Sequence, residues 1–196
     1  MQSPAYGSLM QRLGSSAGMW RGVRRDVSGW RWASSTLSHI DAARHQPAMV
    51  SIGGKVATER SATAACVVRL PDPLSKLLFD DPSEIHTRKG PVFTTAIVAG
   101  TMAVKRTSDL LPFCHPLPIE CIRITIEPSS DRSELHVQCS VDAVYKTGVE
   151  MEALTGASIT ALCIYDMCKS VSLGITIDDT RLVCKSGGKS SLRTTT

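Results

Sequence analysis

Two segments in the C-terminal quarter of the chain combine acids, lysines and glycines in a pattern that indicates chemistry. The first covers residues 146–169 and reads KTGVEMEALTGASITALCIYDMCK, and the second covers 185–190 and reads KSGGKS. Lysines bind phosphate groups as point charges, and positioned carboxylates transfer protons. The combination predicts a site for a polyanionic substrate whose reaction also needs proton transfer.

Asp166 and Lys169 lie three residues apart, which puts them on one face of a helix and predicts an acid/base pair. Glu152 lies fourteen residues before Asp166, within roughly 40° of the same face, but a rise of ~1.5 Å per residue separates the two by ~21 Å. One small reacting centre cannot contact both. The helix dipole alone also favours Glu150 and Glu152 in a first turn and Lys169 in a last turn, so a structural role stays open for each.

The KSGGKS segment resembles a phosphate-binding loop only in part. The Walker pattern requires glycine at position 183, where this chain has Val183, and no helix-length segment follows. Two glycines still expose backbone N–H groups, and Lys185 and Lys189 add positive charge, which predicts an anion-binding nest.

Other candidate residues lie in loops. Prolines in LPFCHPLP, residues 111–118, stiffen the chain around Cys114 and His115, although a histidine beside proline is more often a hydrogen-bonded turn residue. Lys105 near the end of a predicted helix has the alternative of a dipole-favoured cation, and Lys89 that of a solvated loop residue. Crowded lysines lower one another's pKa, which would let one of them exchange a proton near neutrality.

The helices and strands that must position these residues are predicted from the spacing of apolar residues and from the prolines and capping residues at their ends. A helix is expected over 149–170, opened by a capping box of Thr147 and Glu150. Another helix is expected over 92–111, between Pro91 and Pro112. The apolar band predicted to bury the first helix consists of Val149, Ala153, Leu154, Ala157, Leu162, Ile164 and Tyr165.

Strands are predicted at 64–70, at 118–127 and 134–145 as a hairpin around PSSDRS, and once or twice within 173–186; residues 71–86 read as a loop with one helical turn. The order β-α-β-β-α-β predicts an α+β protein of the ferredoxin-like (split βαβ) type. Its antiparallel sheet carries two main helices on one face. The other face is either solvated or packed on another subunit.

Composition narrows the function classes. The chain of 196 residues is 42% hydrophobic without a long apolar run, so no membrane span is expected. Residues 37–196 carry 17 basic and 17 acidic side chains, and aromatic residues make up 5% of the chain, which disfavours nucleic-acid binding. Seven cysteines without CxxC spacing predict no zinc or iron–sulfur site, and most of them should be core thiols.

Residues 1–36 differ from the rest of the chain, because they hold five arginines against the single acid Asp26. The segment is rich in Arg, Ser and Gly and lacks a continuous apolar core, which is typical of a mitochondrial or plastid transit peptide. We expect a disordered leader that directs the protein to the mitochondrial matrix, and one catalytic domain over 37–196. A disordered tail and a basic arm for nucleic acid are the alternatives.

Four blocks resemble the MoaC family, the cyclic pyranopterin monophosphate synthases of molybdenum cofactor biosynthesis. They read KGPVFTTAIVAGTMAVKRTSDLLPFCHPLPI, KTGVEMEALTGAS, YDMCKS and RLVCKSGGKS, and HIDAARHQPAMVSIGGKVATER extends the likeness over residues 38–190. The resemblance implies a phosphorus–oxygen lyase that converts 3',8-cyclo-7,8-dihydro-GTP to cyclic pyranopterin monophosphate and releases pyrophosphate. It also implies a homohexamer, built as a trimer of dimers with sites at dimer interfaces, and a functional link to a radical-SAM GTP cyclase. No cofactor is required, and Mg²⁺ with the triphosphate is left open.

By matching position, the resemblance implies that Asp166, Lys169 and Lys89 are catalytic. One departure concerns Lys89: the block usually written KGDV reads KGPV here, so Pro91 replaces a carboxylate that could orient it. The alternative function is a noncatalytic ferredoxin-like module that binds a purine nucleotide. The residues implied to bind substrate are Phe113, Cys114, His115, Met151, Glu152, Glu150, Arg60, Lys105, Lys146, Lys185 and Lys189.

Overall fold

The structure is a computed structural model that describes residues 40–41, 46–188 and 190–193. The predicted leader at 1–36 and Lys189 of the glycine turn lie outside these ranges. Among the helices of the described part, none combines the length and hydropathy that crossing a membrane requires.

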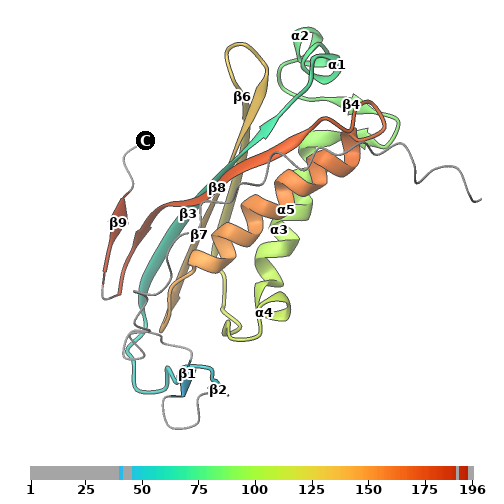
Figure 1. The fold of residues 1–196 in the computed structure, drawn as a ribbon. Helices are drawn as coiled ribbons and strands as arrows, with labels where there is room; N and C mark the ends of the chain where they lie inside the picture. Colours follow the sequence, from blue (N-terminus) through green and yellow to red (C-terminus); the bar gives the residue numbers. More distant parts are fainter. Residues whose placement is uncertain (1–39, 42–45, 189, 194–196) are drawn as a thin grey trace, which may run out of the picture. The chain divides into compact units, whose positions relative to one another are not determined.

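A five-stranded antiparallel sheet forms the framework (Figure 1). Its strands are β3 (Thr58–Arg69), β6 (Cys121–Pro128), β7 (Glu134–Tyr145), β8 (Thr176–Ser186) and β9 (Leu192–Arg193), in the order β6-β7-β3-β8-β9. Short pairs also form between β1 (Ile40–Asp41) and β2 (Gln46–Pro47), and between β4 (His86–Thr87) and β5 (Gly90–Pro91). The strand order of the four long strands is that of the ferredoxin-like fold, as the sequence predicted.

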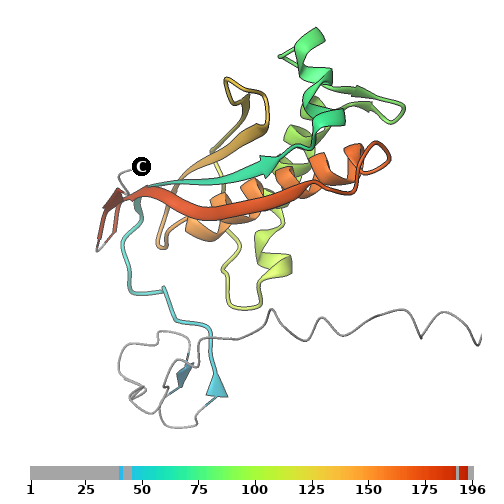
Figure 2. The same ribbon diagram turned by 45° about the horizontal axis from the view of Figure 1, so that its top comes forward.

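Two long helices cover one face of the sheet, and Figure 2 shows them on the same side of β3 and β8. They are α3 (Val92–Lys105) and α5 (Glu150–Cys168), which pack against each other. Three helices of four residues each, α1 (Asp72–Ser75), α2 (Leu77–Asp80) and α4 (Thr107–Leu110), lie in the connections. The predicted fold class is therefore confirmed.

Strand alternation places the core between sheet and helices. In β7, Leu135, Val137, Cys139 and Val141 are fully buried, and the intervening His136 and Gln138 are exposed. β3 is six residues longer at its start than predicted, because it pairs with β7 without interruption from Thr58↔Tyr145 to Arg69↔Glu134. Strand boundaries thus follow the partner strand as well as the local pattern.

The helices differ in two ways from the predictions. The expected helix over 92–111 is divided at Arg106, whose backbone leaves the helical region, so α3 and α4 are separate. The capping box also does not form: Val149 is the N-cap of α5 without a side-chain hydrogen bond. Glu150 is the first residue of α5, so it cannot be the N3 partner of Thr147 that a capping box needs. Its carboxylate instead accepts a hydrogen bond from Lys185 Nζ at 2.9 Å.

Val149, Ala153, Ala157 and Ile164 of the predicted apolar band of α5 are buried, and Leu154 and Tyr165 pack against the core, but the prediction is wrong for Leu162. Leu162 is 54% exposed, whereas Gly156, Ala157 and Ala161 are buried. A Cβ added at Gly100 of α3 would lie 2.0 Å from Thr160 Oγ1 and 3.0 Å from the Gly156 carbonyl oxygen. The two helices therefore approach closely because α3 has no side chain at Gly100, where it faces Gly156 and Thr160 of α5.

Replacing Gly100 by alanine should lower the free energy of unfolding by about 1–3 kcal/mol, because the added methyl group overlaps Thr160 and Ile124. Urea denaturation measures the change. Gly54→Ala is the matched control, since nothing lies within 4 Å of its added Cβ. Equal stability of the two variants would contradict the close helix crossing.

Candidate functional site

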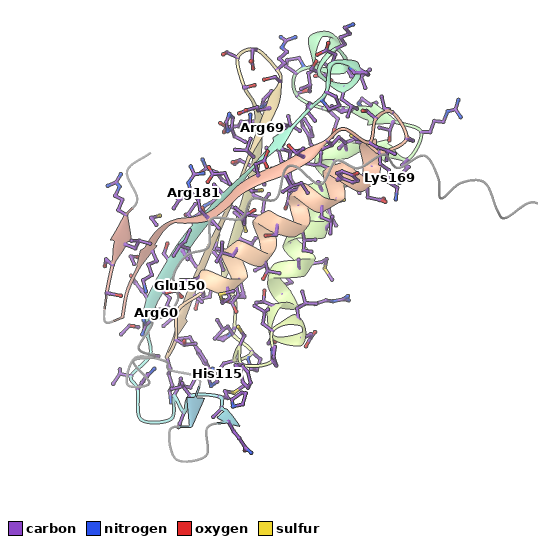
Figure 3. The ribbon with its side chains drawn as sticks, viewed as in Figure 1. Arg60, Arg69, His115, Glu150, Lys169 and Arg181 are labelled. Carbon is purple, nitrogen blue, oxygen red and sulfur yellow. The ribbon has the colours of Figure 1, made fainter. Side chains whose placement is uncertain are left out.

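Helix α5 carries candidate residues at both of its ends. Asp166 lies in its last turn and Glu152 in its first, and the rise of a regular helix separates them by ~21 Å. Figure 3 shows Lys169 at one end of the helix, with Glu150 and Arg60 at the other. A single copy of the chain therefore divides the predicted site residues into two clusters, as the helical spacing predicted.

The C-terminal cluster is an ion-pair network around Asp166. Lys169 Nζ contacts Asp166 Oδ1 at 2.7 Å, and Lys89 Nζ contacts Asp166 Oδ2 at 2.9 Å. Lys89 Nζ also donates to the backbone carbonyl of Asp166 at 2.7 Å. The structure thus brings together the three residues that the resemblance assigns to catalysis.

Electrostatics in this cluster favour the ionised state. Hydrogen bonds from Lys169 and then Lys89 lower the pKa of Asp166 to about 2. Asp166 in turn raises the pKa of Lys169, mainly through the same hydrogen bond. The expectation that crowding lowers a lysine pKa is therefore wrong for Lys169, because a carboxylate stands between the two cations.

Lys89 reaches Asp166 from the turn of the β4–β5 hairpin. The hairpin pairs His86 with Pro91 and Thr87 with Gly90, and Gly90 has a φ of +112°, which favours glycine. Pro91 precedes the first residue of α3. The contact between Lys89 and Asp166 thus forms without a carboxylate at position 91.

At the other end of α5, a cavity of about 220 Å³ contains the predicted nucleotide-binding residues. Glu152 is 4% exposed, and burial raises its pKa to about 7. Burial and then the charge of Glu152 raise the pKa of the neighbouring Cys114. The lining residues are Val50, Ile52, Lys55, Phe113, Cys114, His115, Thr147, Gly148, Glu150, Met151 and Glu152.

A second cavity of about 390 Å³ adjoins the first, because both are lined by Lys55, Thr147, Gly148 and Glu150. Four basic side chains and one acid give it a positive charge that suits a phosphate chain. The lining residues are Lys55, Val56, Arg60, Lys146, Thr147, Gly148, Glu150, Lys185, Gly187, Gly188 and Ser190.

The glycine turn is built against the start of β3. Gly187 and Gly188 have φ angles of +86° and +78°, which side chains adopt only with strain. An added Cβ at Gly187 would lie 2.1 Å from the Glu59 carbonyl oxygen, and one at Gly188 would lie 1.9 Å from an Arg60 guanidinium nitrogen. Both glycines are therefore required for the KSGGKS backbone to approach Arg60.

Lys105, placed by resemblance near the triphosphate, borders a small cleft with His115 and Glu152 and does not line the basic cavity. Lys189 lies outside the described residues.

Sequence reasoning missed Lys55, which lines both cavities. Its signal was available, since GGK at 53–55 repeats the glycine pair followed by lysine in KSGGK. Val50, Ile52, Thr147 and Gly148 were also missed as lining residues.

Within the described part of the chain, no group of three or more His, Cys, Asp or Glu side chains is arranged to hold a metal ion. The charged groups of both clusters are mainly cations, which bind phosphoryl oxygens directly.

Fold and site together define an α+β protein with a basic, nucleotide-sized pocket. The chain belongs to the MoaC family, whose model matches residues 49–188. It is 49% identical to the cyclic pyranopterin monophosphate synthase of Xanthomonas oryzae over 156 residues, which cover 80% of this chain and 92% of that protein.

Two longer relatives also align with this chain. It is 50% identical to the molybdenum cofactor biosynthesis bifunctional protein of Synechocystis, over 81% of this chain and 46% of that protein. It is 48% identical to molybdenum cofactor biosynthesis protein 1 of Dictyostelium discoideum, over 81% of this chain and 27% of that protein. The chain thus spans less than half of these two relatives.

The raised pKa of Glu152 should make stability fall as the pH rises from about 4.5 to about 7. Over this range the folded protein retains a proton that the unfolded chain has lost. The loss should be about 2 kcal/mol, because solvent in the cavity reduces the full effect of the shift. Denaturation at pH 4.5 and pH 7 should show that the free energy of unfolding of Glu152→Gln depends less on pH than that of the wild type. Glu120→Gln, at an exposed position, is the control and should keep the wild-type dependence. Parallel curves for wild type and Glu152→Gln would contradict the buried carboxyl.

Proposed function

We propose that the chain is a cyclic pyranopterin monophosphate synthase, a lyase that converts 3',8-cyclo-7,8-dihydro-GTP to cyclic pyranopterin monophosphate with release of pyrophosphate. The observation that carries the proposal is the pair of adjoining cavities. One holds the buried Glu152 beside His115, and the other holds Arg60, Lys146 and Lys185 around a glycine turn. A purine-derived ring suits the first cavity, and a triphosphate suits the second.

The charges in the basic cavity support the phosphoryl step. When a hydroxyl oxygen attacks the α-phosphorus, pyrophosphate leaves with the bonding electrons and negative charge grows on its oxygens. Lys55, Arg60, Lys146 and Lys185 stabilise this charge without a protein-bound metal. We expect no cofactor, with Mg²⁺ only as a companion of the triphosphate.

Proton transfers in the ring rearrangement need groups of different acidity. Glu152, with a pKa of about 7, exchanges a proton near neutrality, whereas Asp166 stays ionised beside two lysines. A lysine whose carboxylate partner turns to the substrate becomes able to donate its own proton. The two clusters thus supply complementary acids and bases.

We further propose that a site is completed by two copies of the chain. The length of α5 keeps Asp166 ~21 Å from Glu152 within one copy, and a second copy whose Asp166 end meets the first copy's cavity removes this gap. This arrangement agrees with a homohexamer built as a trimer of dimers. Import into the mitochondrial matrix through residues 1–36, and supply of the substrate by a radical-SAM GTP cyclase, complete the proposal.

Purified protein incubated with 3',8-cyclo-7,8-dihydro-GTP should release pyrophosphate and form the cyclic pterin phosphate, measured by enzyme-coupled detection and mass spectrometry. Asp166→Asn should lower kcat at least ~100-fold, because it removes the anion between the two lysines. Equilibrium binding of the substrate should persist. Binding without turnover by the wild-type protein would instead favour the noncatalytic nucleotide-binding module.

Mixing two inactive variants tests whether copies share sites. Asp166→Asn and Glu152→Ala proteins, refolded together, should regain about a quarter of wild-type activity, because half of the dimers are mixed and each keeps one intact site. Asp166→Asn mixed with Lys89→Ala is the control. It should stay inactive, since these two residues belong to the same cluster of one copy. Recovery in the control, or none in the first mixture, would contradict shared sites.

A further inference from the structure

The N-terminus of α3 has no cap from its own N-cap residue. Pro91 holds the N-cap position and makes no side-chain hydrogen bond. The first backbone N–H groups of a helix need acceptors from elsewhere. Here, Val92 N donates to the Ile85 carbonyl oxygen at 2.9 Å, and the next two N–H groups donate to the side chain of Glu84.

Glu84 binds this helix end with both carboxylate oxygens. Its Oε1 accepts from Phe93 N at 2.7 Å and Ile85 N at 2.9 Å, and its Oε2 accepts from Thr94 N at 3.1 Å and Thr94 Oγ1 at 2.9 Å. Burial alone would raise the pKa of Glu84, but these hydrogen bonds outweigh it and lower the pKa. The helix dipole also favours the negative charge at this position.

This contact closes the base of the hairpin that carries Lys89. Ile85 is 1% exposed and anchors one leg in the core, and Val92, which follows the other leg, is fully buried. The hairpin itself has only two residue pairs, His86↔Pro91 and Thr87↔Gly90, and a hairpin of two strands is marginally stable alone. Its geometry therefore depends on how its base is held.

The turn of the hairpin transmits that position to the reactive cluster. Lys89 N donates to Thr87 Oγ1 at 3.2 Å, and Lys89 Nζ reaches both the carboxylate and the backbone carbonyl of Asp166. Lys89 connects to the rest of the fold through the two hairpin legs, and Glu84 joins both legs to the start of α3. If the base of the hairpin moves, Lys89 in its turn moves with it.

We propose that Glu84 is a positioning residue for Lys89: its carboxylate caps α3 from outside the helix and thereby holds the β4–β5 hairpin where Lys89 meets Asp166. Glu84 does not touch the reacting groups. The inference rests on the proposed function for the role of Lys89 in turnover, but the placement of the lysine is independent of that function.

The first test is Glu84→Gln, which keeps the shape of the side chain but replaces one acceptor oxygen by a donor. We expect kcat to fall about tenfold or more while KM stays within about twofold, because Arg60, Lys146 and Lys185 of the basic cavity still bind the phosphate chain. Asp131→Asn is the matched control. Asp131 accepts hydrogen bonds from Ser129 Oγ, Ser133 N and Ser133 Oγ in the β6–β7 turn. Asp131→Asn therefore disturbs a similar set of hydrogen bonds, but in a turn distant from Lys89.

The second test restores the cap from a different position. Residue 91 has φ −70° and ψ 127°, the extended geometry of an N-cap, at which aspartate is a preferred residue. The double variant Glu84→Gln/Pro91→Asp should therefore regain a cap on α3 but not the link between the β4 leg and α3, so its kcat should stay near that of Glu84→Gln. An unchanged kcat in Glu84→Gln, an equal loss in Asp131→Asn, or a double variant with the kcat of the wild type would each overturn the inference.

A third readout does not use activity. Trace acylation followed by mass spectrometry should show Lys89 of Glu84→Gln reacting at least about threefold faster than in wild type, with Lys55 as the internal reference, because its ion pair is loosened. An unchanged acylation rate would overturn the positioning role even if activity were lost. A wild-type protein that forms no cyclic pterin phosphate would contradict the proposed function, and the acylation result would still decide the placement of Lys89.

Discussion

The rigidity of α5 is the constraint on which the account of this protein depends. The helix has nineteen residues, and its hydrogen-bonded backbone fixes the distance between its ends. The helix is also closely packed, because a Cβ added at Gly100 of α3 or at Gly156 of α5 would overlap neighbouring atoms. The two clusters therefore cannot approach each other within one copy, and any reaction that uses both requires a second copy.

The same helix carries two carboxylates with opposite electrostatic environments. Two lysines hold Asp166 ionised with a pKa of about 2, and burial beside the cavity raises the pKa of Glu152 to about 7. Pairs of acids whose environments separate their pKa values in this way divide the work of proton transfer. Partial desolvation of the Asp166 network by a bound substrate would strengthen each interaction in it.

The features that follow from local patterns were predictable from the sequence. Alternation gave the bounds of β7 at 134–145, and the three-residue spacing gave the contact of Asp166 with Lys169. Features that depend on distant partners were not. The capping box does not form because α5 begins at Glu150 with Val149 as N-cap, and the Glu150 carboxylate pairs with Lys185 of β8. Leu162 lies outside the buried face of α5, although Val149 and Ile164 of the same predicted band are buried.

Contacts between residues far apart in the sequence also explain which features of the site could not be predicted. The cap of α3 comes from Glu84, several residues upstream across a hairpin, where no spacing rule applies. The loss of a carboxylate at Pro91 therefore does not release Lys89. GGK at 53–55 resembles the KSGGK segment in sequence, but only the fold shows that Lys55 lines the same cavity as Gly187 and Gly188.

The most direct test of the central claim is the crystal structure of the Asp166→Asn protein with 3',8-cyclo-7,8-dihydro-GTP bound. The account predicts a purine-derived ring beside Glu152 and His115, and phosphates among Arg60, Lys146 and Lys185 of one copy. Lys89 and Lys169 of a second copy should contact the same molecule. A substrate that touches residues of one copy alone, with no second Asp166 end near it, would contradict the account.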